Sequence, residues 1–63
     1  MDPASKTILQ ALGMEVMHFD ELMHITGLQT GPLLSSLLSL EIAGMVRQYP
    51  GKSFGVTLQA GAG

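Results

Sequence analysis

Residues 28–56 constrain the fold more than any other part of the chain. Apolar residues recur at helical spacing over residues 33–43, and Gly44 ends that pattern. Two short runs with strand character follow, and a Pro-Gly pair between them favours a tight turn. The segments are 45–49, 50–53 and 54–56. A helix followed at once by a hairpin is typical of the second half of a winged helix, in which the helix enters a DNA groove and the hairpin is the wing.

The first part of the chain predicts a helix over residues 6–12. Ser5 is expected to cap it, because a serine oxygen accepts a backbone N–H that otherwise has no partner. Ile8, Leu9 and Leu12 give the spacing of a buried stripe, and Gly13 ends the helix. Residues 15–18 are too short for another helix and favour a small β-bridge beside the hairpin.

A second helix is predicted over residues 19–25. Either His18 caps it, with Glu21 completing a capping box, or Asp20 caps it in a competing register. Leu22 and Ile25 are expected to face inward. Gly27 ends this helix, and Pro32 then falls in the first turn of the third. The predicted fold class is α+β, a winged helix with a three-helix helix-turn-helix core and a short β-hairpin wing. The domain is expected to cover residues 6–58, with a disordered leader (1–5) and tail (59–63).

Size and composition exclude several classes of function. The chain has 63 residues and no cysteine, so neither disulfides nor a Cys-based zinc site is available. Hydrophobic residues make up 46%, but no apolar run approaches the roughly 20 residues that a bilayer requires. A free-standing enzyme of this size is unusual, so we expect a cytoplasmic module of a longer protein without a membrane segment.

The charge is distributed unevenly. The net charge is −2, and residues 14–44 contain four acidic residues and no Lys or Arg. The three basic residues are Lys6, Arg47 and Lys52. Strong duplex-binding sites neutralise about 6–10 phosphates. This chain therefore offers few groups for tight binding to DNA.

The third helix carries two apolar ridges. At about 100° per residue, Leu33, Leu37 and Leu40 share one direction, and a second ridge lies about 100–180° away. The second ridge is Leu34, Leu38 and Ile42. It is either further core beneath the first helix or an exposed strip for a partner. Glu41 lies between the ridges and is expected to reach solvent or a cation such as Arg47.

The residues that carry a family resemblance run through most of the chain. They are Ile8-Leu9-Gln10-Ala11-Leu12-Gly13, Val16-Met17-His18-Phe19-Asp20-Glu21-Leu22, Thr26-Gly27-Leu28, residues 37–46 (LLSLEIAGMV) and Pro50-Gly51-Lys52. This pattern resembles the C-terminal winged-helix domain of the DNA-processing protein A family (DprA, also called Smf). The chain departs from the family pattern at Lys52 and Gly55, both in the wing.

The resemblance implies a role in DNA processing during natural transformation, that is, in competence and DNA recombination. Family members bind incoming single-stranded DNA and load a recombinase onto it, chiefly through a Rossmann-like domain to which none of these residues correspond. The winged-helix part is then an accessory that contacts duplex DNA, self-associates or packs on that domain. A recombinase would be reached only through the parent's other domain.

Two candidate sites follow. The favoured one is a protein-interaction surface on the second ridge, for other domains or copies of the parent protein: Leu34, Leu38 and Ile42. The alternative is weak, non-specific contact with duplex DNA through the third helix and wing: Gln29, Thr30, Ser35, Ser36, Ser39, Arg47 and Lys52. The serine face, formed by Ser35, Ser36 and Ser39, has no Arg, Asn or Gln to recognise specific bases. This also argues against a transcriptional winged helix.

Catalysis is not expected, because the sequence contains no nucleophile–base set and no phosphate loop. A cofactor is not expected either. His18 and His24 are six residues apart without a third ligand, so no metal site is predicted.

Overall fold

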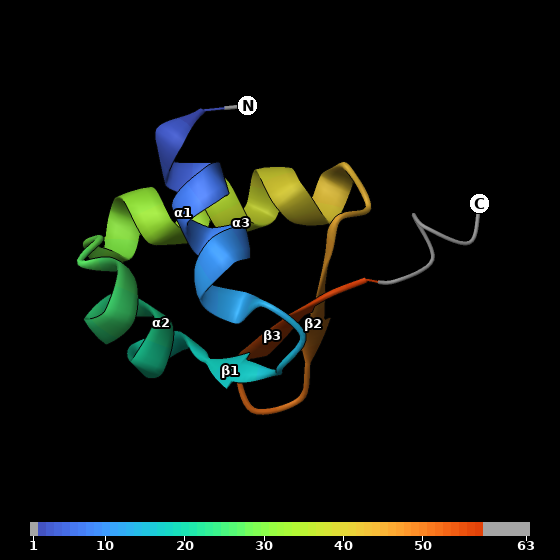
Figure 1. Ribbon diagram of the computed structural model, residues 1–63. Coiled ribbons are helices and arrows are strands. Elements are labelled where there is room, and N and C mark those ends of the chain that lie inside the picture. Colours follow the sequence, from blue (N-terminus) through green and yellow to red (C-terminus); the bar gives the residue numbers. More distant parts are fainter. Residues whose placement is uncertain (1, 58–63) are drawn as a thin grey trace.

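The computed structural model describes residues 2–57, which form three helices and a three-stranded antiparallel sheet. The elements in chain order are α1 (Pro3–Leu12), β1 (Met17–His18), α2 (Phe19–Thr26), α3 (Thr30–Ile42), β2 (Val46–Tyr49) and β3 (Ser53–Val56), as Figure 1 shows. The strand order is β1-β3-β2. The predicted α+β winged-helix architecture is confirmed, including the small bridge of residues 17–18 beside the hairpin. The expected tail over residues 59–63 lies outside the described residues.

The two hairpin strands, β2 and β3, pair antiparallel, and every second residue of each strand faces the same side of the sheet. Val46 pairs with Val56, and Gln48 pairs with Phe54. Val46 and Phe54 are buried, and Val56 is half-buried. Because strand side chains alternate, Arg47 and Tyr49 point away from this inner face. One face of the hairpin, with Val46 and Phe54, therefore packs toward the helices, and the other face, with Arg47 and Tyr49, points away from them.

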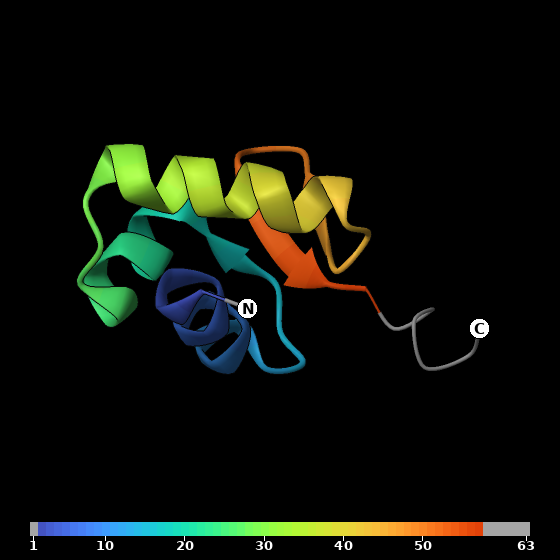
Figure 2. The same cartoon turned by 90° about the horizontal axis from the view of Figure 1, so that it is seen from above.

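The core forms where the three helices meet the inner face of the sheet. In Figure 2, α3 (green to yellow) runs along one side of the molecule, and α1 and α2 (blue and teal) lie on the other. The strands of the sheet lie next to these helices. Eight apolar side chains are at most 4% exposed: Ile8, Leu12, Leu22, Leu33, Leu37, Leu40, Val46 and Phe54. The rings of Phe19 and Phe54, with centroids 6.3 Å apart, extend this core toward the hairpin turn.

The start of α1 differs from the prediction. The helix begins at Pro3, three residues before the expected Lys6, and its N-cap is Asp2 instead of Ser5. An Asp2 carboxylate oxygen accepts the Ser5 backbone N–H at 3.3 Å. Proline at the first helical position has its φ preset and no N–H to satisfy, so Asp2-Pro3 is a stronger start signal than Ser5. Ser5 is buried within the helix, and residues 3–5 are not an extended leader.

The start of α2 confirms one of the two registers. His18 is the N-cap, and its Nδ1 accepts the Asp20 backbone N–H at 3.1 Å. Glu21 completes no capping box within residues 2–57, because its side chain makes no hydrogen bond back to the His18 backbone N–H.

The inward orientation predicted for Ile25 is wrong, because its side chain is 51% exposed. The inward face of α2 is centred on Leu22, with Phe19, Met23 and Thr26 half-buried around it. At 100° per residue, Ile25 lies about 60° from Leu22, on the side opposite Phe19, Met23 and Thr26. Gly27 ends the helix with φ +76°, as predicted.

Candidate functional site

One apolar ridge of α3 is buried in the core, and the other is exposed to solvent. Leu33, Leu37 and Leu40 are buried, at 0%, 1% and 4% exposed. The second ridge is exposed: Leu34 at 53%, Leu38 at 55% and Ile42 at 82%. We call this second set, Leu34, Leu38 and Ile42, the outer ridge. Of the two alternatives that the sequence left open, core and surface strip, the structure places the outer ridge on the surface.

A groove runs between α3 and the inner face of the hairpin. It has a volume of about 280 Å³, and its floor and walls are mostly apolar. The apolar lining is Phe19, Leu34, Leu37, Leu38 and Phe54, and the polar lining is Thr30, Glu41, Gln48 and Lys52. Two members of the outer ridge, Leu34 and Leu38, therefore also form one wall of this groove. The exposed apolar area is a ridge with an adjoining hollow.

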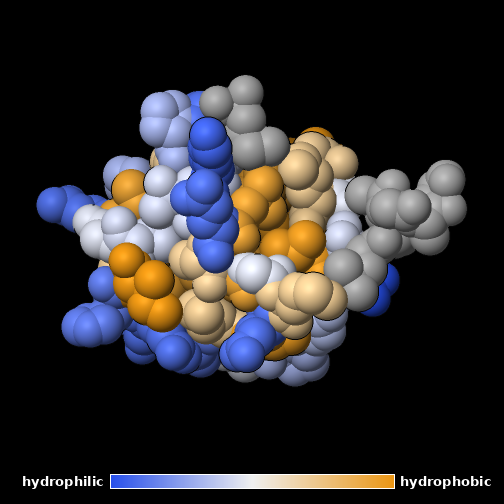
Figure 3. All heavy atoms as spheres, in the orientation of Figure 1, coloured by the Kyte–Doolittle hydropathy of each residue, from blue (hydrophilic) through white to orange (hydrophobic). Residues whose placement is uncertain are grey.

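Figure 3 shows the face of the molecule on which α1 lies, where hydrophobic and hydrophilic side chains are mixed and a row of hydrophilic atoms crosses the middle. A continuous apolar strip along one helix, such as the outer ridge, is characteristic of binding sites.

The serine face of α3 carries little that holds DNA. Ser35 and Ser39 are exposed and Ser36 is half-buried. Glu41 is the single charged residue of α3, and it is an anion. Gln29 is the N-cap of α3 without a side-chain cap hydrogen bond, and Thr30 donates its hydroxyl to Met23 Sδ at 3.3 Å.

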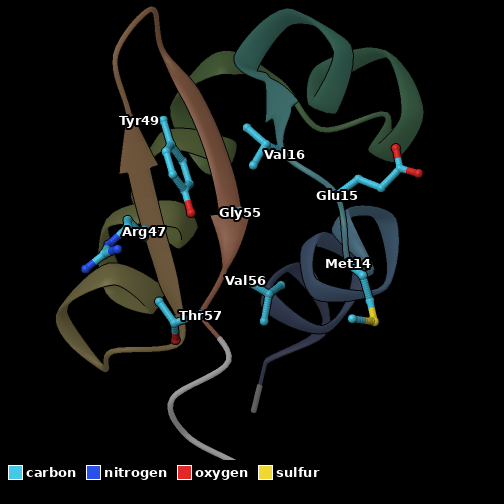
Figure 4. Close-up of a pocket in the computed structure, with 8 residues that line it drawn as sticks. All are labelled: Met14, Glu15, Val16, Arg47, Tyr49, Gly55, Val56 and Thr57. Carbon is cyan, nitrogen blue, oxygen red and sulfur yellow. The ribbon is translucent and has the colours of Figure 1, made fainter.

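The two wing cations lie on opposite sides of the hairpin. Arg47 lines a hollow on the outer face, together with Tyr49 (Figure 4). Lys52 lines the α3 groove. The third cation, Lys6, is on α1. The basic residues that the sequence offered for phosphates are therefore not gathered on one surface. Of the two alternatives expected for Glu41, solvent and a cation such as Arg47, the structure has solvent: Glu41 is exposed on the groove side, and no Glu41–Arg47 ion pair forms within residues 2–57.

Gly55 shapes the hollow on the outer face. This hollow has a volume of about 370 Å³. A Cβ at Gly55 would lie 3.1 Å from Val16 Cγ2 and 3.3 Å from Tyr49 Cε1, so the glycine lets these two side chains close over β3 (Figure 4). The departure from the family pattern at Gly55 was visible in the sequence, but this packing was not predicted. The alternation of side chains in β2 could have predicted it, because it places Arg47 and Tyr49 on the face opposite Val46.

Neither a metal-binding cluster nor a spanning helix is found in the described part of the chain. No three His, Asp or Glu side chains of residues 2–57 are grouped so that they could hold a metal ion. Among the same residues, no helix combines the length and apolar character needed to cross a membrane.

Comparison with known proteins identifies the family. The DprA winged helix domain family matches residues 1–52, which include all three helices, β1 and β2 and end just before β3. The chain belongs to this family. A curated relative, Protein Smf of Synechocystis sp. (strain ATCC 27184 / PCC 6803 / Kazusa), is 37% identical over 54 residues. That alignment covers 86% of this chain and 14% of Smf. No solved structure matches the chain.

Membership confirms the resemblance that the sequence predicted, on both the fold and the family. The DprA winged helix domain accounts for the order of helices and wing. Because the chain spans only about one seventh of the length of Smf, the relative contains much that this chain does not correspond to.

Proposed function

We propose that this DprA winged helix domain is a non-catalytic accessory module of a cytoplasmic DNA-processing protein that acts in natural transformation. In this proposal the module attaches to protein, either another domain of the parent or a second copy, through the outer ridge. A recombinase would be reached only through the parent's other domain. The observation that carries the proposal is the exposure of Leu34, Leu38 and Ile42 along one side of α3.

The energetics of the outer ridge support this proposal. Fully burying an aliphatic side chain contributes about 1.5–3 kcal/mol, and each side chain of the outer ridge still has half or more of its surface in water. Covering all three would therefore contribute several kcal/mol to association before the entropy cost of binding. The nearest charged side chain of α3 is Glu41, which lines the groove beside the outer ridge and is exposed to solvent.

Weak contact with duplex DNA is the second candidate. Its support is the exposed serine face, Ser35 and Ser39, with Gln29 and Thr30 at the entry to α3. Lys52 is the one cation that lines the groove beside α3, whereas Arg47 is on the far side of the hairpin. If one or two phosphates are neutralised, the logarithm of the binding constant falls with the logarithm of the salt concentration with a slope of only about −1 to −2. Such contact is too weak to be the main attachment.

The test compares Leu38→Glu with Ile25→Glu, two exposed apolar positions on different helices. Each substitution is made both in the isolated chain and in the longer parent protein. We expect Leu38→Glu to abolish docking or self-association, measured by NMR line broadening and sedimentation, while Ile25→Glu leaves both intact. Loss with both variants, or with neither, contradicts the proposal.

A duplex titration addresses the second candidate. An isotope-labelled chain is titrated with a duplex of about 20 base pairs at 50 and 150 mM salt. Large shifts at Ser35, Ser39 and Lys52 that persist at the higher salt concentration would favour DNA contact as the main function.

A further inference from the structure

We infer that the groove beside α3 binds an extended peptide segment, which adds a strand to the free edge of β2. The inference rests on the proposed function, because Leu34 and Leu38 of the outer ridge form one wall of this groove. It narrows the partner from a folded surface to a linear segment. Three observations point to such a segment: the direction of the Gln48 backbone groups, the apolar wall beside them, and the charges at the two ends of the groove.

The backbone groups of Gln48 point away from β3. In an antiparallel pair, every second residue bonds to the partner strand, and the residues between them direct their N–H and C=O outward. The Thr57 N–H donates to the Met45 carbonyl oxygen at 3.0 Å, and two residues further along β2 in the same register Arg47 pairs with Gly55. Gln48 follows this bonded pair, so its N–H and C=O face the open edge of β2.

The pairing of β1 with β3 gives the same result. The Phe19 N–H donates to the Lys52 carbonyl oxygen, so in that register Met17 and Phe54 are also a bonded pair. Phe54 therefore directs its backbone groups toward β1 and away from Gln48, which lies opposite it on β2. Within residues 2–57, no other group bonds to the backbone of Gln48.

Gln48 is the accessible residue of this edge. Val46 points outward in the same register but is 2% exposed, and Pro50, which follows the strand, has no N–H. Gln48 is exposed and lines the groove. An antiparallel strand, the more stable arrangement per residue, would exchange two hydrogen bonds with Gln48 through a single residue. The added strand is therefore short and runs antiparallel to β2.

The groove next to this edge accommodates an apolar side chain. Side chains directly opposite each other on neighbouring strands lie on the same face of a sheet, so the peptide residue opposite Gln48 points to the face that carries Phe54. That face borders the groove of about 280 Å³, in which Leu34 and Leu38 remain 53% and 55% exposed. Because two exposed main-chain hydrogen bonds add little net stability, the apolar anchor supplies most of the affinity.

The charges at the ends of the groove determine the order of residues in the peptide. Lys52 lies in the turn at the tip of the hairpin, whereas Glu41 lies at the base, where its carbonyl oxygen accepts the Gly44 N–H. An antiparallel segment enters at the tip and leaves at the base. Residues two before and two after the anchor share its face, so an acidic residue before it faces Lys52 and a basic residue after it faces Glu41. The expected pattern is acidic, any, apolar, any, basic.

A capped seven-residue peptide tests this pattern: threonine, glutamate, threonine, leucine, threonine, lysine, threonine. Titrated onto the isotope-labelled 63-residue chain at low salt, it should bind with a dissociation constant on the order of 0.1–1 mM and shift the Gln48 amide and the methyl groups of Leu34 and Leu38. Exchanging the glutamate and the lysine should weaken binding at least about threefold, and replacing the leucine with alanine at least about fivefold. Equal binding of all three peptides, or no binding at about 5 mM, overturns the inference.

A backbone variant tests the added strand itself. Gln48→Pro removes the outward N–H without removing a hydrogen bond between β2 and β3, and edge strands tolerate proline at such positions. Gln48→Ala keeps the N–H and is the matched control. We expect Gln48→Pro to bind the peptide at least about fivefold more weakly and Gln48→Ala to bind it like the unsubstituted chain. Dispersed amide spectra establish that both variants fold, and equal affinities would overturn strand addition.

Amide exchange in the unsubstituted chain gives a readout that does not depend on a variant. Saturating peptide should slow exchange of the Gln48 amide at least about fivefold and leave the Arg47 amide, already bonded to Gly55, unchanged. Unchanged exchange at Gln48 would overturn strand addition. A chain that does not bind the peptide while Leu38→Glu abolishes docking in the parent protein would also overturn it and leave the proposed function standing.

Discussion

The backbone N–H of Phe19 donates a hydrogen bond to the carbonyl oxygen of Lys52, with nitrogen and oxygen 2.9 Å apart. Phe19 is the first residue of α2, so this N–H would otherwise be one of the unpaired donors of a helix start. Lys52 is in the turn between β2 and β3. The bond therefore ties the tip of the hairpin to α2, at the end of the groove that Phe19 and Lys52 both line.

Lys52 has a φ of +61° in this turn, the only positive φ of a non-glycine residue within residues 2–57. The left-handed conformation costs an L-residue about 1–2 kcal/mol, and glycine avoids that cost but loses about 0.4–1 kcal/mol through the unfolded state. Lys52→Gly should therefore raise the free energy of unfolding by about 0.5–1 kcal/mol in urea denaturation. A decrease would show that the lysine side chain makes a stabilising contact.

His18 should contribute to stability as the cap of α2. Replacing a capping side chain with alanine typically costs about 0.5–2 kcal/mol. Because His18 is an exposed and uncommon cap, we expect His18→Ala to lower the free energy of unfolding by about 0.5–1 kcal/mol and His18→Asn to be nearly neutral. His24→Ala, at an exposed position in the same helix, is the control. Equal effects at both histidines would contradict the capping role.

The start of α1 should be sensitive to acid. Hydrogen bonding by the Ser5 side chain, and then by the Ser5 backbone N–H, lowers the pKa of the Asp2 carboxyl from 3.8. A lowered carboxyl pKa means that the stabilisation is present above the unfolded-state value and is lost as the pH falls through the folded-state value. The first turn of α1 should therefore fray only below pH 3.8.

An NMR pH titration of the Ser5 amide checks this expectation. In the unsubstituted chain the midpoint should lie below 3.8. Asp2→Asn retains a capping oxygen that does not titrate, so its Ser5 amide should show no such transition. A midpoint at or above 3.8 would contradict the hydrogen-bonded cap.

The two ridges of α3 should differ strongly in their effects on stability. Leu37 is 1% exposed, and truncating a buried leucine to alanine costs about 2–5 kcal/mol. Leu38 is 55% exposed, so Leu38→Ala should cost less than about 1 kcal/mol in the dilute chain. Thermal unfolding followed by circular dichroism measures both. Similar losses for these adjacent leucines would mean that Leu38 belongs to the core.

The order of α3, turn and hairpin could be predicted because local signals agree there. Helical spacing ends at Gly44, and Pro50-Gly51 can only suit a turn. The predicted Ser5 cap of α1 is wrong because Asp2-Pro3 is a stronger helix start than Ser5. Ile25 was misplaced because α2 has about two turns, too few for its apolar spacing to define the inward direction.

The candidate site could be predicted only in part. A helical wheel gives the angle between the ridges of α3, but which ridge α1 and the hairpin cover depends on how the elements pack. Likewise, Arg47 and Lys52 are close in sequence, and only the three-dimensional path of the hairpin separates them onto opposite sides. The identity of the partner is not encoded in any local pattern, so it stays a prediction.

The most direct test of the outer ridge as an attachment surface is the solvent exposure of its methyl groups. A soluble paramagnetic probe broadens exposed methyl signals, and it can be applied to the dilute chain and to the assembled longer protein. We predict strong broadening of Leu34, Leu38 and Ile42 in the dilute chain and clear protection in the assembly, with Ile25 broadened in both. Equal broadening of the outer ridge in both samples would contradict this account, as would protection already present in the dilute chain.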